Sequence, residues 1–458
     1  MRLWFLRIWA QLRGSFWFVP STMMFAAAAM AFALCELDTV FDNGKTEYWN
    51  WLVTSADSAR STLSLLSGTM ITLAGVVFSL TMVTLSLTSS QFGSRLLRTV
   101  ITDLTTQVGL GAFLATAFYC LIVQRYIPAL AESPFVPHLA VAVASGFALI
   151  SLAVMIGFVH HVSVAIQAQT VVKEAAADLD DVIERFFPDC ESEDSAACHD
   201  SQSNDRRELM NTPTSSRHSL RSESEGYLQA VDLDALHETA CSHNVTLVLG
   251  QSLGSFVIRD SVLLHILHRE DSTDEGKDQW EVDDSVQQRL NSFFLIGRDR
   301  TPHQDVCCAL DNLVEIALRA LSPGINDPFT AIVCIDRLTA SFVRLAQRRF
   351  PEPCRQDDDN CPQIVFQQVQ FPELLRQVFQ PIRQDGADSL MVAMRLMVSL
   401  DRISQHCIRA ADRAEIVRQT KCLLADVKRT TPLAEDREEI ETIGHAMLAR
   451  LADDPLGQ

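Results

Sequence analysis

The sequence contains little glycine and proline, with 18 and 16 residues in a chain of 458. This excludes collagen-like and low-complexity architectures, which need far more of one or both. Basic residues are also in the minority, because 38 lysines and arginines accompany 57 aspartates and glutamates. The resulting net charge of −19 argues against a nucleic-acid-binding protein, which needs a basic surface to neutralise phosphates. At roughly 150 residues per domain, the length predicts about three folding units. The 48% of hydrophobic residues excludes disorder throughout the chain.

Charge is almost absent from the first third of the chain. Residues 1–162 contain 8 basic and 7 acidic residues, which leaves 30 of the 38 and 50 of the 57 for residues 163–458. Four long segments of this third have no charged residue at all. A helix needs about 20 apolar residues to cross a bilayer. We therefore predict a transmembrane domain over 1–162, with helices near 15–35, 64–87, 107–126 and 138–160.

The arginines predict how these helices are oriented. Three arginines precede the first helix, and Arg95 and Arg98 follow the second. The connection 36–61 instead contains five acidic and only two basic residues. The positive-inside rule then places both termini and the loop 88–106 in the cytoplasm of a bacterium, with the helices in its inner membrane.

The charged remainder is predicted to be a cytoplasmic α+β domain. Its expected segments are a juxtamembrane helix at 163–187, a mobile linker at 188–225, a small β-containing subdomain at 226–300 and a helical subdomain at 301–458. Short runs rich in β-branched residues, punctuated by glycine, indicate the strands. The pattern of the helical subdomain predicts helices near 303–321, 328–349, 372–384, 387–409, 411–429 and 435–452. The fold class is thus mostly α: four transmembrane helices, a small β unit and a helical bundle.

The segment 319–331 joins the first two of these helices. Pro323 and Gly324 are residues that end a helix, whereas Asp327 followed by Pro328 is typical of a helix start. Local physics therefore predicts a tight helical hairpin. The alternative is that Ser322, Asn326 and Asp327 form an ion or small-ligand site, and the sequence leaves both interpretations open.

Several segments occur in an order that is specific to one family. They are Ser15–Pro20, Asp57–Arg60, Gly68–Ser79, Ser89–Arg98, Arg300–Asp305 and Arg319–Ala331. On these segments the chain resembles the bacterial predicted membrane proteins grouped as domain of unknown function 2254, from about residue 15 to past residue 400. The resemblance implies four membrane helices followed by a cytoplasmic domain, and it implies no activity.

The second predicted membrane helix has an unusual face. Small and hydroxyl residues, with one methionine, share an arc of roughly 100° when residues are placed 100° apart. They are Ser64, Gly68, Thr72, Gly75, Ser79, Met82, Ser86 and Ser89. Such a stripe is either a close seam between helices or the wall of a water-filled path, and in a symmetric oligomer the two uses merge. Gln91, Arg95 and Arg98 would then lie at the inner mouth.

The membrane helices lack the ionisable group that coupled transporters use, so passive functions remain. The chain has no Walker A loop and no His-Glu-x-x-His motif, and we expect neither an enzyme nor a cofactor or bound metal. We predict a homo-oligomeric channel or pore in the lipid bilayer, gated by its cytoplasmic domain. The acidic remainder favours cations. The alternative is a non-conducting sensor or scaffold whose cytoplasmic domain binds a small ligand or a protein.

Overall fold

A computed structural model describes residues 16–42, 55–92, 103–127, 136–165, 167–189, 217–243, 245–268, 284–351, 354–356, 362–367 and 369–453. The chain divides into two compact units, Met1–Val171 and Val172–Gln458, and each is described by itself.

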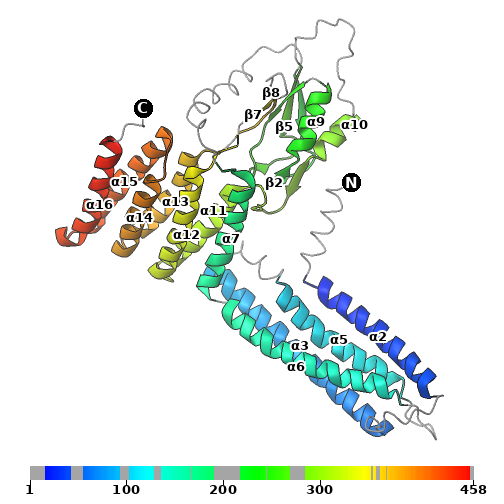
Figure 1. Ribbon diagram of the computed structural model, residues 1–458. Helices are drawn as coiled ribbons and strands as arrows, with labels where there is room; N and C mark the ends of the chain where they lie inside the picture. Colours follow the sequence, from blue (N-terminus) through cyan, green and yellow to red (C-terminus); the bar gives the residue numbers. More distant parts are fainter. Residues whose placement is uncertain are drawn as a thin grey trace, which may run out of the picture. The chain divides into compact units, whose positions relative to one another are not determined.

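The first unit consists of four long helices: α2 (Phe18–Asp42), α3 (Ala56–Phe92), α5 (Leu104–Arg125) and α6 (His138–Ala165) (Figure 1). All four are long and apolar enough to cross a membrane, as the charge-free segments predicted. α3 begins at Ala56, whereas its predicted start was near residue 64. The prediction followed the apolar segment, and the first turns of α3 lie outside that segment because they contain Asp57 and Arg60. Arg60 donates a hydrogen bond of 2.8 Å to the carbonyl of Ile127, just beyond α5.

Helix α5 lies at the centre of this unit. It packs against α2, α3 and α6. In the apolar 18-residue stretch of α5, 72% is buried, compared with 17–28% in the corresponding stretches of the other three helices. Two pairs of polar groups bridge helices of this unit, and buried polar groups are normally paired in this way. The Tyr119 hydroxyl donates to the Ala140 carbonyl at 3.0 Å, and the hydroxyls of Thr116 and Ser151 are also 3.0 Å apart.

Two aspartates cap helices at the ends of this unit. Asp103 is the N-cap of α5, and its carboxylate accepts hydrogen bonds from the N–H groups of Thr105 and Thr106. Asp38 of α2 accepts from the N–H of Ala140 in the first turn of α6, at 3.0 Å. A carboxylate satisfies the free N–H groups of a helix start, so these acidic residues have a structural role at the helix ends.

Helix α7 (Ala168–Phe186) contains the boundary between the units, and the second unit contains two sheets. The five-stranded sheet has the order β1 (Arg217–Arg221), β5 (Val262–His268), β3 (Val245–Leu249), β8 (Pro362–Val365), β7 (Cys354–Gln356). The three-stranded sheet has the order β4 (Phe256–Val257), β2 (Gly226–Val231), β6 (Phe294–Gly297). Neighbouring strands are antiparallel except β3 and β8, which are parallel. Helices α9 (Leu233–His243) and α10 (Asp284–Asn291) belong to the same region (Figure 1).

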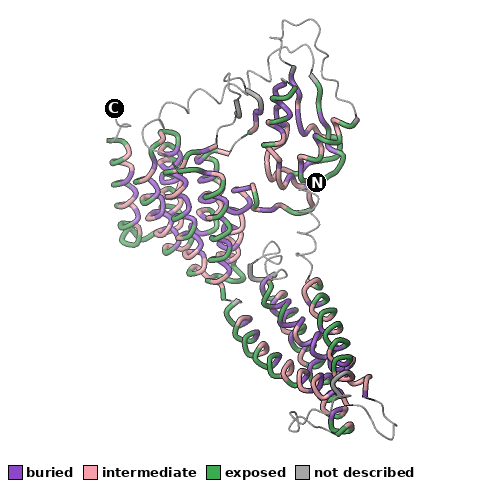
Figure 2. The backbone as a smooth tube through the Cα atoms, turned by 45° about the vertical axis from the view of Figure 1, so that its right-hand side comes forward, coloured by how far each residue is buried: buried purple, intermediate pink, exposed green. Residues whose placement is uncertain are grey.

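Six helices follow as a stack of three hairpins, α11–α12, α13–α14 and α15–α16 (Figures 1 and 2). Their bounds are Val306–Leu321, Pro328–Gln347, Phe371–Gly386, Leu390–Ser404, Ala410–Thr430 and Ala434–Asp453. One row contains α11, α13 and α15, and the other contains α12, α14 and α16. Their amphipathic patterns turn the apolar faces toward each other, and Figure 2 shows the buried positions along the inside of the stack.

Helices within a row run in the same direction. At the end of α12, Gln347 lies 2.8 Å from His406, which follows the end of α14. Near the ends of α14 and α16, Asp401 and Arg450 form an ion pair of 2.8 Å. The connections within the three hairpins therefore lie at one end of the stack, and we call them the hairpin tips.

The predicted class is confirmed: four membrane-like helices are followed by a region of small sheets and helices. Details of the sheets differ from the sequence prediction. β1 lies within the predicted linker 188–225, where only Leu220 of its five residues is apolar and pairing with β5 makes the strand. β7 and β8 lie within the predicted helical subdomain 301–458, and they are too short to show a periodicity. The sheet therefore takes strands from both sides of residue 300.

Candidate functional site

The predicted stripe of α3 is exposed in the single chain. Ser64, Gly68, Thr72, Gly75, Ser79, Met82 and Ser86 all have exposed side chains or, for glycine, exposed backbones. None of them is used to pack α3 against α2, α5 or α6. The Thr72 hydroxyl donates to the Gly68 carbonyl of its own helix at 3.0 Å, so this polar group is satisfied without a neighbour.

The opposite side of α3 makes the contacts within the chain. Its buried positions recur at helical spacing, and the apolar ones belong to the clusters shared with α5 and α6. They are Ala59, Leu63, Ser67, Met70, Ala74, Val77, Thr81, Thr84 and Thr88. At 100° per residue their mean direction is roughly 140° from that of the stripe. The seam inside the chain and the stripe are therefore different surfaces of one helix.

Glycines show the same division. A Cβ built at Gly68 or Gly75 meets nothing within 4 Å. A Cβ at Gly111 of α5 would lie 2.6 Å from the Met23 sulfur and 3.2 Å from the Pro20 Cα, so α2 approaches α5 closely there. Among the four long helices, close packing is thus permitted by Gly111, which does not belong to the predicted stripe. Its signal was a small residue in an apolar helix, which many positions share.

The remaining members of the predicted pore lie beyond the described side chains. Ser89 and Gln91 belong to the backbone of α3, but their side chains are not described. Arg95 and Arg98, the other two residues of the predicted inner mouth, lie outside the described residues, as do Arg2, Arg7 and Arg13.

The loop between α11 and α12 has the predicted capping geometry. Asp327 is the N-cap of α12: one carboxylate oxygen accepts from the N–H groups of Phe329 and Thr330, both at 3.1 Å, and the other accepts from the Thr330 hydroxyl at 2.6 Å. Ser322 is the C-cap of α11, and its hydroxyl donates to the Arg319 carbonyl. Asn326 is exposed and has a φ of +49°, a conformation that asparagine tolerates. The alternative role of Ser322, Asn326 and Asp327 as a ligand site remains a prediction.

Arg300 connects the sheets to the first helix of the stack. Its guanidinium binds Asp305 at 2.8 Å and Asp311 at 2.9 Å. Burial raises the pKa of Asp305, and the charge and hydrogen bonds of Arg300 partly offset this. Gly254, with a φ of +76°, lies against this pair, where any side chain would collide with the Asp305 carboxylate. The segment 300–305 therefore has a structural role, because it fixes the start of α11 to the region of the sheets.

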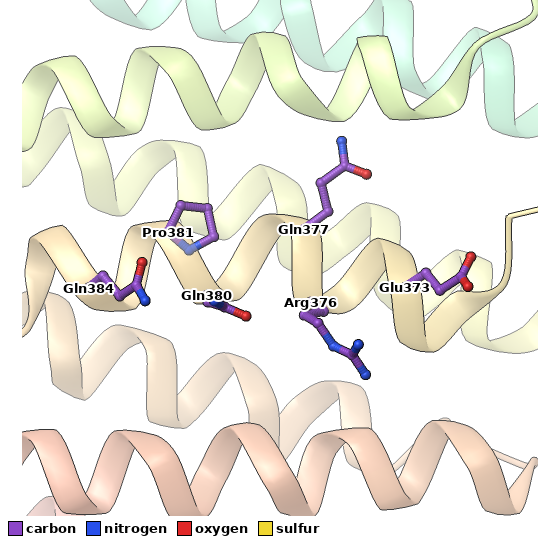
Figure 3. A pocket seen from close by; sticks show the side chains of 6 residues that line it. All are labelled: Glu373, Arg376, Gln377, Gln380, Pro381 and Gln384. Atoms are coloured by element: carbon purple, nitrogen blue, oxygen red, sulfur yellow. The ribbon is translucent and has the colours of Figure 1, made fainter. Parts of the chain in front are cut away.

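An open groove of about 390 Å³ runs along the outer face of α13 (Figure 3). Five of its six lining residues are of polar types, and all come from one helix: Glu373, Arg376, Gln377, Gln380, Pro381 and Gln384. Figure 3 shows Arg376 and Gln377 pointing to opposite sides of the helix. Gln377 donates to Asp311 and to the Cys307 carbonyl of α11.

On the other side of the groove, Arg376 reaches Glu415 of α15. Glu415 is 4% exposed and is bound by Arg376 at 3.0 Å and by Arg418 at 2.6 Å. Burial by itself would raise the pKa of Glu415, but hydrogen bonds from Arg418, Arg376 and Gln419 outweigh it and lower the pKa to about 2. Two half-exposed guanidiniums thus share one buried carboxylate at the edge of the groove.

No metal site is found in the part of the chain that the structure describes. No group of three or more histidine, cysteine, aspartate or glutamate side chains among those residues could hold a metal ion. Burial, followed by the charge of Asp305, raises the pKa of Cys307 to about 12, and burial raises that of Cys407 to about 12 as well. Both thiols are therefore protonated at neutral pH.

Comparisons with known proteins identify one family. The family described as "Predicted membrane protein (DUF2254)" matches residues 13–402. An uncharacterized protein of Mycobacterium bovis and one of Mycobacterium tuberculosis are each 29% identical over 392 residues, covering 85% of this chain and 72% of the relative. No solved structure matches the chain.

Proposed function

The chain belongs to the DUF2254 family of predicted membrane proteins, and from this premise we propose that it assembles with copies of itself into a passive channel lined by α3. The channel lies in the bacterial inner membrane, with both termini and all residues after α6 in the cytoplasm. The lipid bilayer and other copies of the chain are its partners, and the second unit regulates it.

The observation that supports this proposal is the exposure of the α3 stripe. Small residues are enriched where two membrane helices meet, because they let the backbones approach closely. Gly68 and Gly75 leave the backbone of α3 open to such an approach by another helix. In an oligomer whose copies of α3 surround a central axis, the hydroxyls of Ser64, Ser79 and Ser86 would face the water along that axis.

Charge supports a preference for cations. Residues 163–458 contain 30 basic and 50 acidic residues, so the cytoplasmic mouth would lie in a negative potential. Such a potential raises the local concentration of cations and lowers that of anions.

The test replaces Ser79 by leucine in the full-length chain, purified and reconstituted in liposomes. In a channel, the larger side chain blocks the path and cation flux falls while the oligomer stays intact. The matched control is Thr69→Leu, which also replaces an exposed hydroxyl on α3 but lies outside the stripe. It should leave both flux and assembly unchanged.

Two outcomes would contradict the channel. If Ser79→Leu leaves both the oligomer and the flux unchanged, α3 does not line a path. If Ser79→Leu dissociates the oligomer and the unmodified protein shows no flux, the stripe is a packing seam only.

The orientation is tested by labelling cysteines from outside intact cells. Lys45→Cys should be labelled and Thr99→Cys should not. Asp103 is avoided because its side chain caps α5. Cys241 is exposed in the second unit, so labelling of the unmodified chain in intact cells would itself overturn the orientation.

A non-conducting sensor or scaffold is the second candidate. The polar groove on α13 favours it, because stacked helical hairpins commonly present such surfaces to ligands. A protein that forms an oligomer without conducting, and whose α13 exchanges its amides more slowly in the presence of cell extract, would support this candidate.

A further inference from the structure

Each of the three hairpin tips exposes large apolar side chains. Ile325 and Phe329 in the first tip are 45% and 67% exposed, Met391 in the second is 47% exposed, and Leu433 in the third is 66% exposed. Among the described residues of 306–453, Ile408 is the other large apolar residue with comparable exposure, at 56%, and it lies at the opposite end of the helices. The exposed apolar residues are therefore concentrated at one end of the stack.

Helix α7 runs in the same direction as α12. Asp180 of α7 forms an ion pair with Arg344 of α12, and Arg348 donates to the carbonyls of Ile183 and Phe187 farther along α7. Both helices rise about 1.5 Å per residue, so the start of α7 lies level with the first turn of α12, where Phe329 is found. The hairpin tips are thus at the end of the stack where α7 begins.

The chain leaves the membrane shortly before the start of α7. The apolar span of α6 ends at Val164, and α7 begins at Ala168. Four residues cover at most about 14 Å even when fully extended. The first turn of α7 is therefore close to the bilayer surface, whatever angle α7 makes with it.

We propose that the hairpin tips dock on the bilayer surface, with Phe329, Met391 and Leu433 inserted among the lipid headgroups and upper acyl chains. Large apolar side chains gain free energy by leaving water for this region. Three tips in a row give several points of contact along the stack. This inference goes beyond the proposed channel and does not depend on conduction.

Acidic and basic side chains are mixed at the tips. Asp388, Glu435 and Asp436 are exposed there, and so are Lys428 and Arg429 in the last turn of α15. Neither sign of headgroup charge is strongly favoured, so docking depends on apolar insertion and is expected on zwitterionic lipid.

The experiment uses full-length protein in phosphatidylcholine vesicles with plain or dibrominated acyl chains, because bromine quenches nearby tryptophan. Phe329→Trp and Leu433→Trp each add one tryptophan at a tip, and Ile408→Trp adds one at the opposite end as the matched control. The six native tryptophans give a background that is measured on the unmodified chain. We expect the added emission to be lost in brominated lipid for the two tip variants and retained for the control.

A second measurement needs no substitution. Phosphatidylcholine with a photoactivatable acyl chain should form adducts on peptides containing Phe329 and Leu433, and none on the peptide containing Ile408. Added emission at both tips that is equal in the two lipids, together with unlabelled tip peptides, would overturn the proposal. If the added emission changes with the number of protein molecules per vesicle but not with bromination of the lipid, the tips contact a second copy of the chain. That result would also overturn the proposal.

Discussion

Gln304 satisfies both backbone polar groups of Val231. Its side-chain oxygen accepts a hydrogen bond from the Val231 N–H at 3.0 Å, and its side-chain nitrogen donates to the Val231 carbonyl at 3.3 Å. Val231 is buried at the end of β2, beyond Gly226 and Tyr227, where β4 pairs with that strand. One glutamine side chain thus takes the place of a neighbouring strand.

Gln304→Ala should loosen the three-stranded sheet. The substitution leaves a buried N–H and a buried carbonyl without these partners, at a cost of about 1–3 kcal/mol in the free energy of unfolding. Amide exchange at Val231, measured by mass spectrometry or NMR, should accelerate accordingly. Gln288→Ala on the exposed face of α10 is the control and should have little effect. Unchanged exchange at Val231 in Gln304→Ala would contradict the role given to this side chain.

Gly111→Ala and Gly68→Ala should have different effects on the membrane unit. A methyl group at Gly111 collides with the Met23 sulfur and crowds the Pro20 Cα of α2, so it should destabilise the monomer by about 1–3 kcal/mol. The same change at Gly68 meets no atom of the chain, so it should leave the thermal stability of the monomer unchanged. Any shift in oligomeric mass for Gly68→Ala, measured by native mass spectrometry, would report contact with another copy. A monomer destabilised equally by both substitutions would contradict the assignment of the stripe to the outer surface.

Asp327→Ala should cost about 1 kcal/mol of local helix stability, because it removes the N-cap of α12. Asp327→Asn should be almost silent, since asparagine caps a helix comparably well. Amide exchange in the first turn of α12 measures both effects. A loss of flux or of ligand binding in Asp327→Asn, with the fold and the oligomer intact, would show that the charge of Asp327 has a function beyond capping.

Acid should weaken the contact between α13 and α15. The pKa of Glu415 is about 2 in the folded chain, below its ordinary value of 4.5, so the stabilisation is fully present above pH 4.5 and is lost as the pH falls toward 2. At 1.36 kcal/mol per unit, the contribution is at most roughly 3 kcal/mol. Glu415→Gln should destabilise α13 and α15 at pH 7 and flatten the pH dependence of their amide exchange between pH 5 and 3. The exposed Glu438→Gln is the control, and an equal flattening there would assign the effect to general charge.

Local patterns were sufficient for much of this architecture. Charge-free segments predicted the four membrane helices, because the bilayer excludes ionisable groups over a fixed length. The cap at Asp327 was predictable for a similar reason, since the residues that end α11 and start α12 are adjacent in the chain. The bounds of α11 to α16 follow from apolar periodicity and agree with the structure to within a few residues.

What the sequence could not predict depends on distant partners. Arg376 and Glu415 are 39 positions apart, and no spacing rule connects them. β1 has one apolar residue and becomes a strand only through pairing with β5. The stripe of α3 could be found from helical periodicity, but its exposure could not, because that depends on which face of α3 packs against α5.

The parallel pairing of β3 and β8 affects the order in which the chain can fold during synthesis. Leu247 and Val248 pair with Ile364 and Val365, so α11 and α12 must be made before this part of the sheet can form. Until then, one edge of β3 is unpaired and could pair with another chain. All five residues of β3, Val-Thr-Leu-Val-Leu, are buried in the folded protein. A nascent chain that stalls between residues 250 and 360 should therefore be the most prone to aggregation and the most dependent on chaperones.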